Sequence, residues 1–248
     1  MIEKREQVKY EQILHDGEAT RYNDTVVKIY GTKTKIITSG WTKNFSGPFL
    51  DYGCGTGQVS SSLVKQHSDV FAFDISSESV RINVKKNKVQ AVVADLFYLP
   101  FKEKSFRTIC INGVMHHVID LKNAFDEATR LSSDFICISE GCIINYYPIW
   151  WMFIKKVINI FGFLIKILIG DIAKLRMSLP GVSKYERPLD PSFIIKLLEE
   201  RDYYIIYKKF YTDVSLLKDG KIKRIITRKF ISNRKGTHFE IVARRECV

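Results

Sequence analysis

The sequence predicts an α/β fold, a doubly wound and mostly parallel seven-stranded sheet with an apolar helical insertion after the fifth strand. Short apolar runs alternate with segments of helical periodicity, and a glycine-rich turn, PFLDYGCGTGQVSSSL, covers residues 48–63. Nearly every one of the first five runs ends in a polar residue. Because parallel strands bring their carboxyl ends to one edge of a sheet, the pattern predicts a ligand site at that edge.

Length and composition fit one large domain with a sizeable core. The chain has 248 residues, of which 46% are hydrophobic and 27% charged, and both fractions are ordinary for a globular protein. The formal net charge of +12 favours a polyanionic partner such as nucleic acid or an anionic membrane, although a lysine-rich solvated surface explains it equally well.

Cysteine usage and the N-terminal segment indicate a reducing compartment. No CxxC pair occurs and most cysteines lie in apolar runs, so we expect reduced structural thiols and no metal site. The five are Cys54, Cys110, Cys137, Cys142 and Cys247. The N-terminal segment MIEKREQVKYEQ has no apolar core of a signal peptide. A cytoplasmic protein is therefore expected.

Residues 1–46 are expected to form an N-terminal helical preface to a main domain over 47–248. Val8, Ile13 and Leu14 recur near helical spacing, and the HDGEAT segment at 15–20 is predicted to be a loop. Such a preface would cap the ligand cleft or pack beside the sheet.

The first strand covers 49–50, ends at Asp51 and enters the turn that holds Gly53, Gly55 and Gly57. Glycine permits a positive φ, and its missing Cβ lets a ligand touch the backbone. The helix that follows presents free N–H groups at its start. This combination predicts a nucleotide-binding turn.

The second strand, 70–73, ends at Asp74, and the third, 89–94, ends at Asp95. An acid about 20 residues after a glycine turn is where a neighbouring strand offers a carboxylate to ribose hydroxyls. Each aspartate could instead be a helix N-cap.

The remaining elements complete the sheet. Helices are expected at 76–87, 121–131 and 193–198, and strands at 108–111, 135–138, 203–207 and 238–243. The last two strands are expected to form a hairpin at the sheet edge, and the basic tract 218–235 a loop or hairpin arm.

The insertion 141–190 contains a long apolar stretch at 146–170. Lys155 and Lys156 interrupt it, so it has no uncharged window of the roughly 18 residues that a membrane span needs. On a helix, one narrow stripe would hold Lys155, Asn159, Gly162, Lys166 and Gly170, with Trp150 and Trp151 at the boundary. A hydrophobic lid, a helix in a membrane interface and a buried core helix all remain open.

The glycine turn departs from the dinucleotide pattern G-x-G-x-x-G, because Gln58 stands where the third glycine belongs. Four segments together, LDYGCGTG, FAFDIS, VVADLFYLPF and FRTICINGVMHHV, resemble the class I S-adenosylmethionine-dependent methyltransferases, particularly those acting on small molecules and lipid quinones. The resemblance runs from 49 to 139 and more faintly through 191–243. It implies a Rossmann-like methyltransferase fold with S-adenosylmethionine as cofactor.

The resemblance also implies roles for the matched residues. Asp51 and the turn backbone would hold the methionine part of the cofactor, Asp74 the ribose hydroxyls, and Asp95 the adenine amino group. The other expected cofactor contacts are Tyr22, Gly53, Cys54, Gly55, Gly57, Ile75, Leu96, Asn112 and Met115. Carboxylates suit this cofactor, since they accept hydrogen bonds from hydroxyls and amines and favour a nearby sulfonium cation.

Methyl transfer is an in-line displacement that depends mainly on alignment. For a hydroxyl or activated carbon acceptor, the candidate catalytic bases are His116, His117 and Glu140. Alternatively, the histidines are packing residues and Glu140 is in a buried salt bridge.

The sequence therefore predicts a methyltransferase acting on a small-molecule or lipid-linked acceptor, with a membrane-surface contact through 146–170 as one use of the insertion. An RNA methyltransferase, a nicotinamide oxidoreductase and a binding fold without catalysis remain alternatives. Nucleic acid is not the expected partner, because the aromatic residues cluster with aliphatic ones and not with the basic tract.

Overall fold

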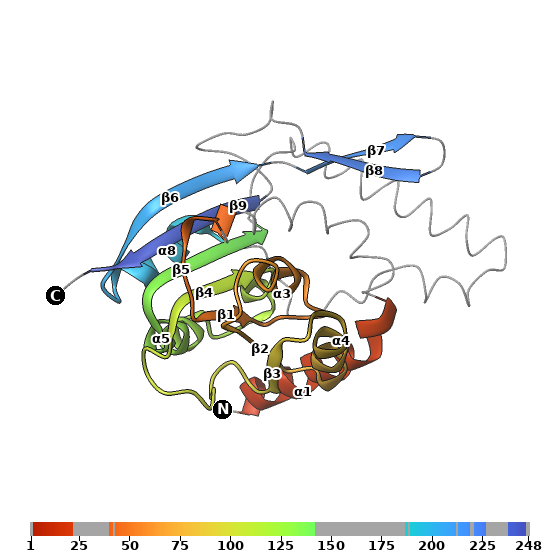
Figure 1. Ribbon diagram of the computed structural model, residues 1–248, viewed down its shortest axis with the longest axis horizontal. Helices are drawn as coiled ribbons and strands as arrows, with labels where there is room; N and C mark the ends of the chain where they lie inside the picture. Colours follow the sequence, from red (N-terminus) through yellow and green to blue (C-terminus); the bar gives the residue numbers. More distant parts are fainter. Residues whose placement is uncertain are drawn as a thin grey trace.

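The computed structural model describes residues 2–21, 40–41, 43–141, 187, 189–211, 213–218, 221–226 and 238–246 (Figure 1). Tyr22 and nearly all of the insertion 141–190 lie outside these residues. The predictions for Tyr22 and for the stretch 146–170 therefore stay predictions, as does the division at residue 46.

The main sheet has seven strands in the order β3-β2-β1-β4-β5-β9-β6. Its parallel part consists of β1 (Phe49–Tyr52), β2 (Val70–Asp74), β3 (Gln90–Val93), β4 (Phe106–Asn112) and β5 (Ser132–Gly141). β9 (His238–Arg245) runs antiparallel between β5 and β6 (Tyr203–Tyr211). The predicted mostly parallel seven-stranded sheet is confirmed, and its order reverses between β1 and β4.

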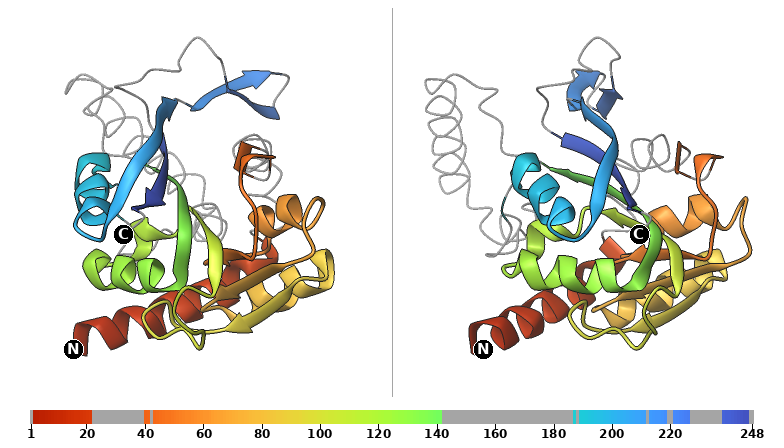
Figure 2. Two further views of the ribbon diagram at one scale, coloured as in Figure 1. Left: turned by 60° about the vertical axis from the view of Figure 1, so that its left-hand side comes forward. Right: turned by 90° about the vertical axis from the view of Figure 1, so that its left-hand side faces the viewer.

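Helices cover both faces of the sheet (Figures 1 and 2). They are α1 (Ile2–Arg21), α3 (Gln58–Leu63), α4 (Ser77–Asn87), α5 (Leu121–Leu131) and α8 (Pro191–Glu199), with a short 3-10 helix η2 (Met115–His117). Among the described residues, no helix is both long and apolar enough to cross a membrane. A separate two-stranded ribbon pairs β7 (Asp213–Lys218) with β8 (Lys221–Ile226), so the start of the basic tract is a hairpin arm as predicted.

Two hydrophobic cores result from the alternation of side chains along the strands. Leu50 and Tyr52 of β1 belong to the core that also contains α5 and α8, whereas Phe49 belongs to the core with Trp41 and α3. Every residue of β1 is buried. Burial on both faces is what a doubly wound sheet requires of its central strand.

Helix α5 shows how sequence pattern becomes packing. Asp120 caps its start by accepting a hydrogen bond from the Asn123 amide at 3.2 Å, and residues spaced three and four apart form its buried face. Phe125, fully buried there, contributes roughly 3–5 kcal/mol by the usual cost of replacing such a side chain with alanine.

The N-terminal helix is longer than the sequence predicts. α1 continues through residues 15–20, the segment expected to be a loop, and includes Gly17. Tertiary contacts explain the difference. Ala19 is buried, and the Asp16 carboxylate accepts hydrogen bonds from Ser76 Oγ at 2.7 Å and the Glu78 amide at 3.0 Å at the start of α4. These contacts outweigh the roughly 1 kcal/mol that glycine costs a helix.

Candidate active site

The turn between β1 and α3 holds three glycines with positive φ, 69° at Gly53, 48° at Gly55 and 84° at Gly57. A Cβ on Gly53 would lie 2.7 Å from Val114 Cγ2, and one on Gly57 would collide with the Asn83 side chain. A Cβ on Gly55 would meet no atom within 4 Å. Gly53 and Gly57 therefore allow close packing, while Gly55 leaves its backbone open to a ligand.

The buried Asp51 carboxylate stabilises this turn through hydrogen bonds with Ser60 at the start of α3. Its Oδ2 accepts hydrogen bonds from the Ser60 amide at 2.8 Å and from Ser60 Oγ at 2.5 Å, and the carboxyl group is 1% exposed. Burial raises the pKa of Asp51 to about 7, although the Ser60 hydrogen bonds oppose the rise. Its predicted contact with the methionine ammonium group stays a prediction.

Asp74 lies at the end of β2, beside the open glycine. Its carboxylate accepts hydrogen bonds from the Gly55 amide at 2.7 Å and the Ser76 amide at 2.9 Å. Burial raises the pKa of Asp74, and these two amides oppose the rise. A carboxylate has about four acceptor positions, so it can still receive two hydroxyl groups. The N-cap alternative is wrong for Asp74, because Ser76 caps α4.

Asp95 shapes the turn after β3. Its Oδ1 accepts a hydrogen bond from the Phe97 amide at 3.0 Å, and no helix follows it, so the N-cap alternative is wrong here too. Asn112, Ile75 and Leu96 are partly exposed at the ends of β4, β2 and β3, respectively. The structure thus brings these residues to the same edge of the sheet as Asp74.

Met115 and Cys54, two of the predicted cofactor contacts, have buried side chains. Met115 is fully buried in the core. Cys54 is buried as well, and its backbone amide binds the carbonyl of Phe73 at 2.8 Å, which ties the turn to β2. The predicted cofactor contacts of both residues stay predictions.

The turn has room and polarity for a nucleoside-type ligand. Thr56 Oγ1 is buried and has no hydrogen-bond partner among the described residues, and the neighbouring Gly55 is open. Together with the Asp74 carboxylate, these groups fit a ligand that carries several hydroxyl and amino groups. The residues present therefore suit S-adenosylmethionine.

Glu140, at the end of β5, holds the segment after β4 in place. Its Oε1 accepts hydrogen bonds from the amides of Val114 at 2.7 Å and Met115 at 2.8 Å, and Oε2 pairs with His116 Nδ1 at 2.8 Å. Burial would raise the pKa of Glu140, but His116 and the two amides hold it below its usual range.

A base with a lowered pKa and both oxygens occupied is poorly suited to remove a proton. These contacts favour a positioning role for Glu140, and its role as a catalytic base stays a prediction. His116, which Glu140 orients, is partly exposed and is the better candidate base.

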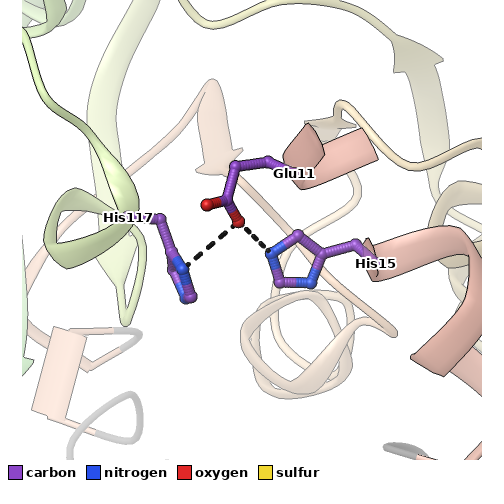
Figure 3. A group of neighbouring side chains, drawn as sticks. All are labelled: Glu11, His15 and His117. Atoms are coloured by element: carbon purple, nitrogen blue, oxygen red, sulfur yellow. Dashed lines mark ion pairs between the residues drawn. The ribbon is translucent and has the colours of Figure 1, made fainter. Parts of the chain in front are cut away.

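A second group joins the N-terminal helix to the same region. Figure 3 shows Glu11 between His15 and His117, with Glu11 Oε2 at 3.2 Å from His15 Nε2 and 3.5 Å from His117 Nδ1. Burial would lower the pKa of His15, but Glu11 and Asp74 hold it above its usual value. Burial keeps the pKa of His117 low despite Glu11.

Sequence reasoning missed Glu11 and His15. The available signal was their spacing of four residues in a helical segment, which places both on one face. Their partner His117 lies more than 100 residues away in sequence, so only the fold reveals the group.

Comparisons with known proteins agree with this site. A family described as a methyltransferase domain matches residues 50–134. An uncharacterized protein of Methanocaldococcus jannaschii is 28% identical over 200 residues, which cover 74% of this chain and 70% of the relative. Demethylmenaquinone methyltransferase of Oceanobacillus iheyensis is 29% identical over 130 residues, covering 47% of this chain and 55% of that enzyme.

A solved structure agrees in fold. Magnesium protoporphyrin IX methyltransferase from Synechocystis PCC 6803, with bound S-adenosylhomocysteine, superimposes with a TM-score of 0.59 at 15% identity and covers 96% of this chain and 100% of its own. Fold, site and matched domain identify the chain as a class I S-adenosylmethionine-dependent methyltransferase. Its cofactor is S-adenosylmethionine.

Proposed function

We propose that this enzyme methylates an ionisable hydroxyl, or the ring carbon that such a hydroxyl activates, on a small quinol-type acceptor, with His116 as the general base. The observation that carries the proposal is the His116–Glu140 pair at the carboxyl ends of β4 and β5. The demethylmenaquinone methyltransferase relative supports this class of acceptor.

The cofactor would be held mainly by the glycine turn and the strand-end acids. Asp74 would receive the ribose hydroxyls, Asp95 the adenine amino group, and the open backbone at Gly55 the methionine part. Bound S-adenosylmethionine supplies an electrophilic methyl group. The contact of Gly53 with Val114 joins the turn to the segment that carries His116, so a bound cofactor would lie next to the proposed base.

The carboxylate of Glu140 determines which ring nitrogen of His116 carries the proton. A carboxylate accepts a hydrogen bond, so Nδ1 of His116 carries the proton and Nε2 keeps the lone pair. Nε2 can then take the proton from the acceptor O–H, and the electron pair released strengthens the attacking oxygen or conjugated carbon. The imidazolium that forms is stabilised by the buried Glu140.

A quinone ring suits this chemistry only in its reduced form. The ring carbon of a hydroquinone is electron-rich, whereas that of the oxidised quinone is electron-poor and does not attack an electrophile. The insertion 141–190 is the proposed acceptor element, either as an apolar lid or as a membrane contact through 146–170, because its sequence combines aliphatic residues, tryptophans and lysines.

Cofactor binding is tested by calorimetry with S-adenosylhomocysteine. Asp74→Asn should weaken binding at least about tenfold, the typical cost of roughly 1.5–3 kcal/mol for a hydrogen bond to a charged group. The control is Asp69→Asn, an exposed aspartate at the opposite end of β2. Equal binding by both variants would refute the ribose role of Asp74.

The base is tested by methyl transfer to demethylmenaquinone with a shortened side chain under reducing conditions. His116→Gln should lower kcat by about 10²–10⁴-fold and leave S-adenosylhomocysteine binding unchanged. Glu140→Gln should alter the pH profile of kcat, because it changes the orientation and charge stabilisation of His116. His67→Gln, in the segment after α3, is the control. Full activity of the His116 variant would remove the general base from the mechanism.

Acceptor selection is tested by deleting 146–170. Cofactor binding should survive while transfer to the acceptor is lost. Loss of both together would contradict a separate acceptor element.

A further inference from the structure

We propose that Glu11, His15 and His117 form a binding site for one divalent transition-metal ion of the zinc type, placed between the N-terminal helix and the segment after β4. No metal site is predicted from the sequence, because that expectation rests on the spacing of the cysteines alone. The proposal concerns a different donor set, which the fold assembles from two distant parts of the chain (Figure 3).

The distances within the group suit a small ion. Glu11 Oε2 lies 3.2 Å from His15 Nε2 and 3.5 Å from His117 Nδ1, and all three ligand atoms lie within 4.8 Å of one another. A tetrahedral ion with bonds of about 2.1 Å separates its ligand atoms by about 3.4 Å. Two of the three separations already have that size, so only the two histidines need to approach.

The donor set selects the class of metal. Two imidazole nitrogens and one carboxylate are typical of zinc and of non-haem iron, whereas magnesium and calcium prefer oxygen ligands. Glu11 and His15 are four residues apart on α1, a spacing that puts two ligands on one face of a helix. Three protein ligands leave a tetrahedral ion one further position, for water or an acceptor oxygen.

A second observation points to a ligand at this place. Nδ1 of His117 is buried and lies 3.5 Å from Glu11 Oε2, but within the described part of the chain it makes no hydrogen bond. A buried nitrogen in this condition costs about 1–3 kcal/mol. An ion between His117 and the carboxylate of Glu11 would satisfy this nitrogen.

Neighbouring groups support the ligands from behind. The Gln7 side chain donates to the carbonyl of His117, and its Oε1 accepts a hydrogen bond from the Ile119 amide at 3.3 Å, which holds the His117 segment against α1. The rings of His15 and His117 meet edge to face at 5.1 Å. Such support is typical of metal ligands.

The site lies beside the active site. Asp16, the residue after His15, accepts a hydrogen bond from Ser76 Oγ at 2.7 Å, and Ser76 follows Asp74 by two residues, so α1 lies next to the carboxylate assigned to the ribose. An ion bound there would join α1 to the segment after β4, next to the active site. The inference concerns metal binding and does not depend on the identity of the methyl acceptor.

The test uses the full chain after treatment with a chelator. Zn²⁺ is titrated by calorimetry, and Co²⁺ is followed by its visible absorption. We expect one ion per chain and the absorption of a tetrahedral cobalt centre. Glu11→Gln, His15→Gln and His117→Gln should each weaken binding at least about tenfold. Glu6→Gln on α1 and His67→Gln are the matched controls and should bind like the parent.

Three outcomes would overturn the proposal. They are no binding tighter than millimolar, equal binding by ligand and control variants, or a sulfur-to-cobalt band that indicates cysteine ligands. If a variant fails to fold, X-ray absorption of the zinc-loaded parent decides, with nitrogen and oxygen ligands expected at about 2.0–2.1 Å and sulfur at about 2.3 Å contradicting the site. S-adenosylhomocysteine binding, measured on the same variants, separates failure of this site from failure of the proposed function.

Discussion

Asp51 should make the ligand-free protein less stable as the pH rises, and Asp51→Asn should remove that dependence. Burial raises the pKa of Asp51 to about 7 in the folded protein, compared with 3.8 for the ordinary side chain. The folded state therefore binds the proton more tightly than the unfolded state does. The stabilisation that this group provides is fully present below about pH 4 and is lost as the pH rises through about 7.

The magnitude follows from the size of the shift. Each pKa unit is worth about 1.4 kcal/mol, so between pH 5 and pH 8 the group removes roughly 3 kcal/mol from the free energy of unfolding of the parent protein. Asparagine has nearly the same shape and can still accept the hydrogen bond from the Ser60 amide. The variant should match the parent at pH 5 and be the more stable protein at pH 8.

Urea unfolding followed by circular dichroism at pH 5, 6, 7 and 8 measures the effect. The midpoints of parent and variant should diverge with rising pH while the slopes m remain equal. Asp69→Asn, which changes an exposed aspartate, should follow the parent throughout. Parallel stability curves for parent and Asp51→Asn would refute the burial argument.

Two further predictions concern the turn and the N-terminal helix. Gly57→Ala should destabilise the protein by more than about 1–2 kcal/mol, because the new side chain combines a φ of 84° with a collision against Asn83. Gly17→Ala, in open space on α1, should stabilise the protein by about 0.5–1 kcal/mol. Similar effects of the two changes in thermal unfolding would contradict this account of the turn. Asp16→Ala should cost about 1–2 kcal/mol by removing the contacts with Ser76 and Glu78, and hydrogen exchange should show faster opening of α1. Unchanged exchange in α1 would mean that other contacts hold this helix.

The local sequence pattern was sufficient to predict the sheet and the edge at which the candidate cofactor site lies. The apolar runs that precede Asp51, Asp74 and Asn112 became parts of β1, β2 and β4, because a strand buried on both faces needs such a run. The glycines were readable for the same reason, since a turn with positive φ excludes most other residues.

Roles that depend on contacts across the fold were not readable in this way. Met115 and Glu140 stand in the expected positions, yet packing makes one a core residue and the other the support of His116. The continuation of α1 through Gly17 depends on a partner some 60 residues away.

The sequence by itself determined the order of strands and helices and the glycine turn, because each follows from the conformational limits and hydrophobicity of neighbouring residues. The class of cofactor followed from the resemblance of four segments to a known family. Only the tertiary structure decided which polar groups meet. Glu11, His15 and His117 come together because α1 packs across the end of the sheet, and the chemistry of such a group depends on distances that no local pattern contains.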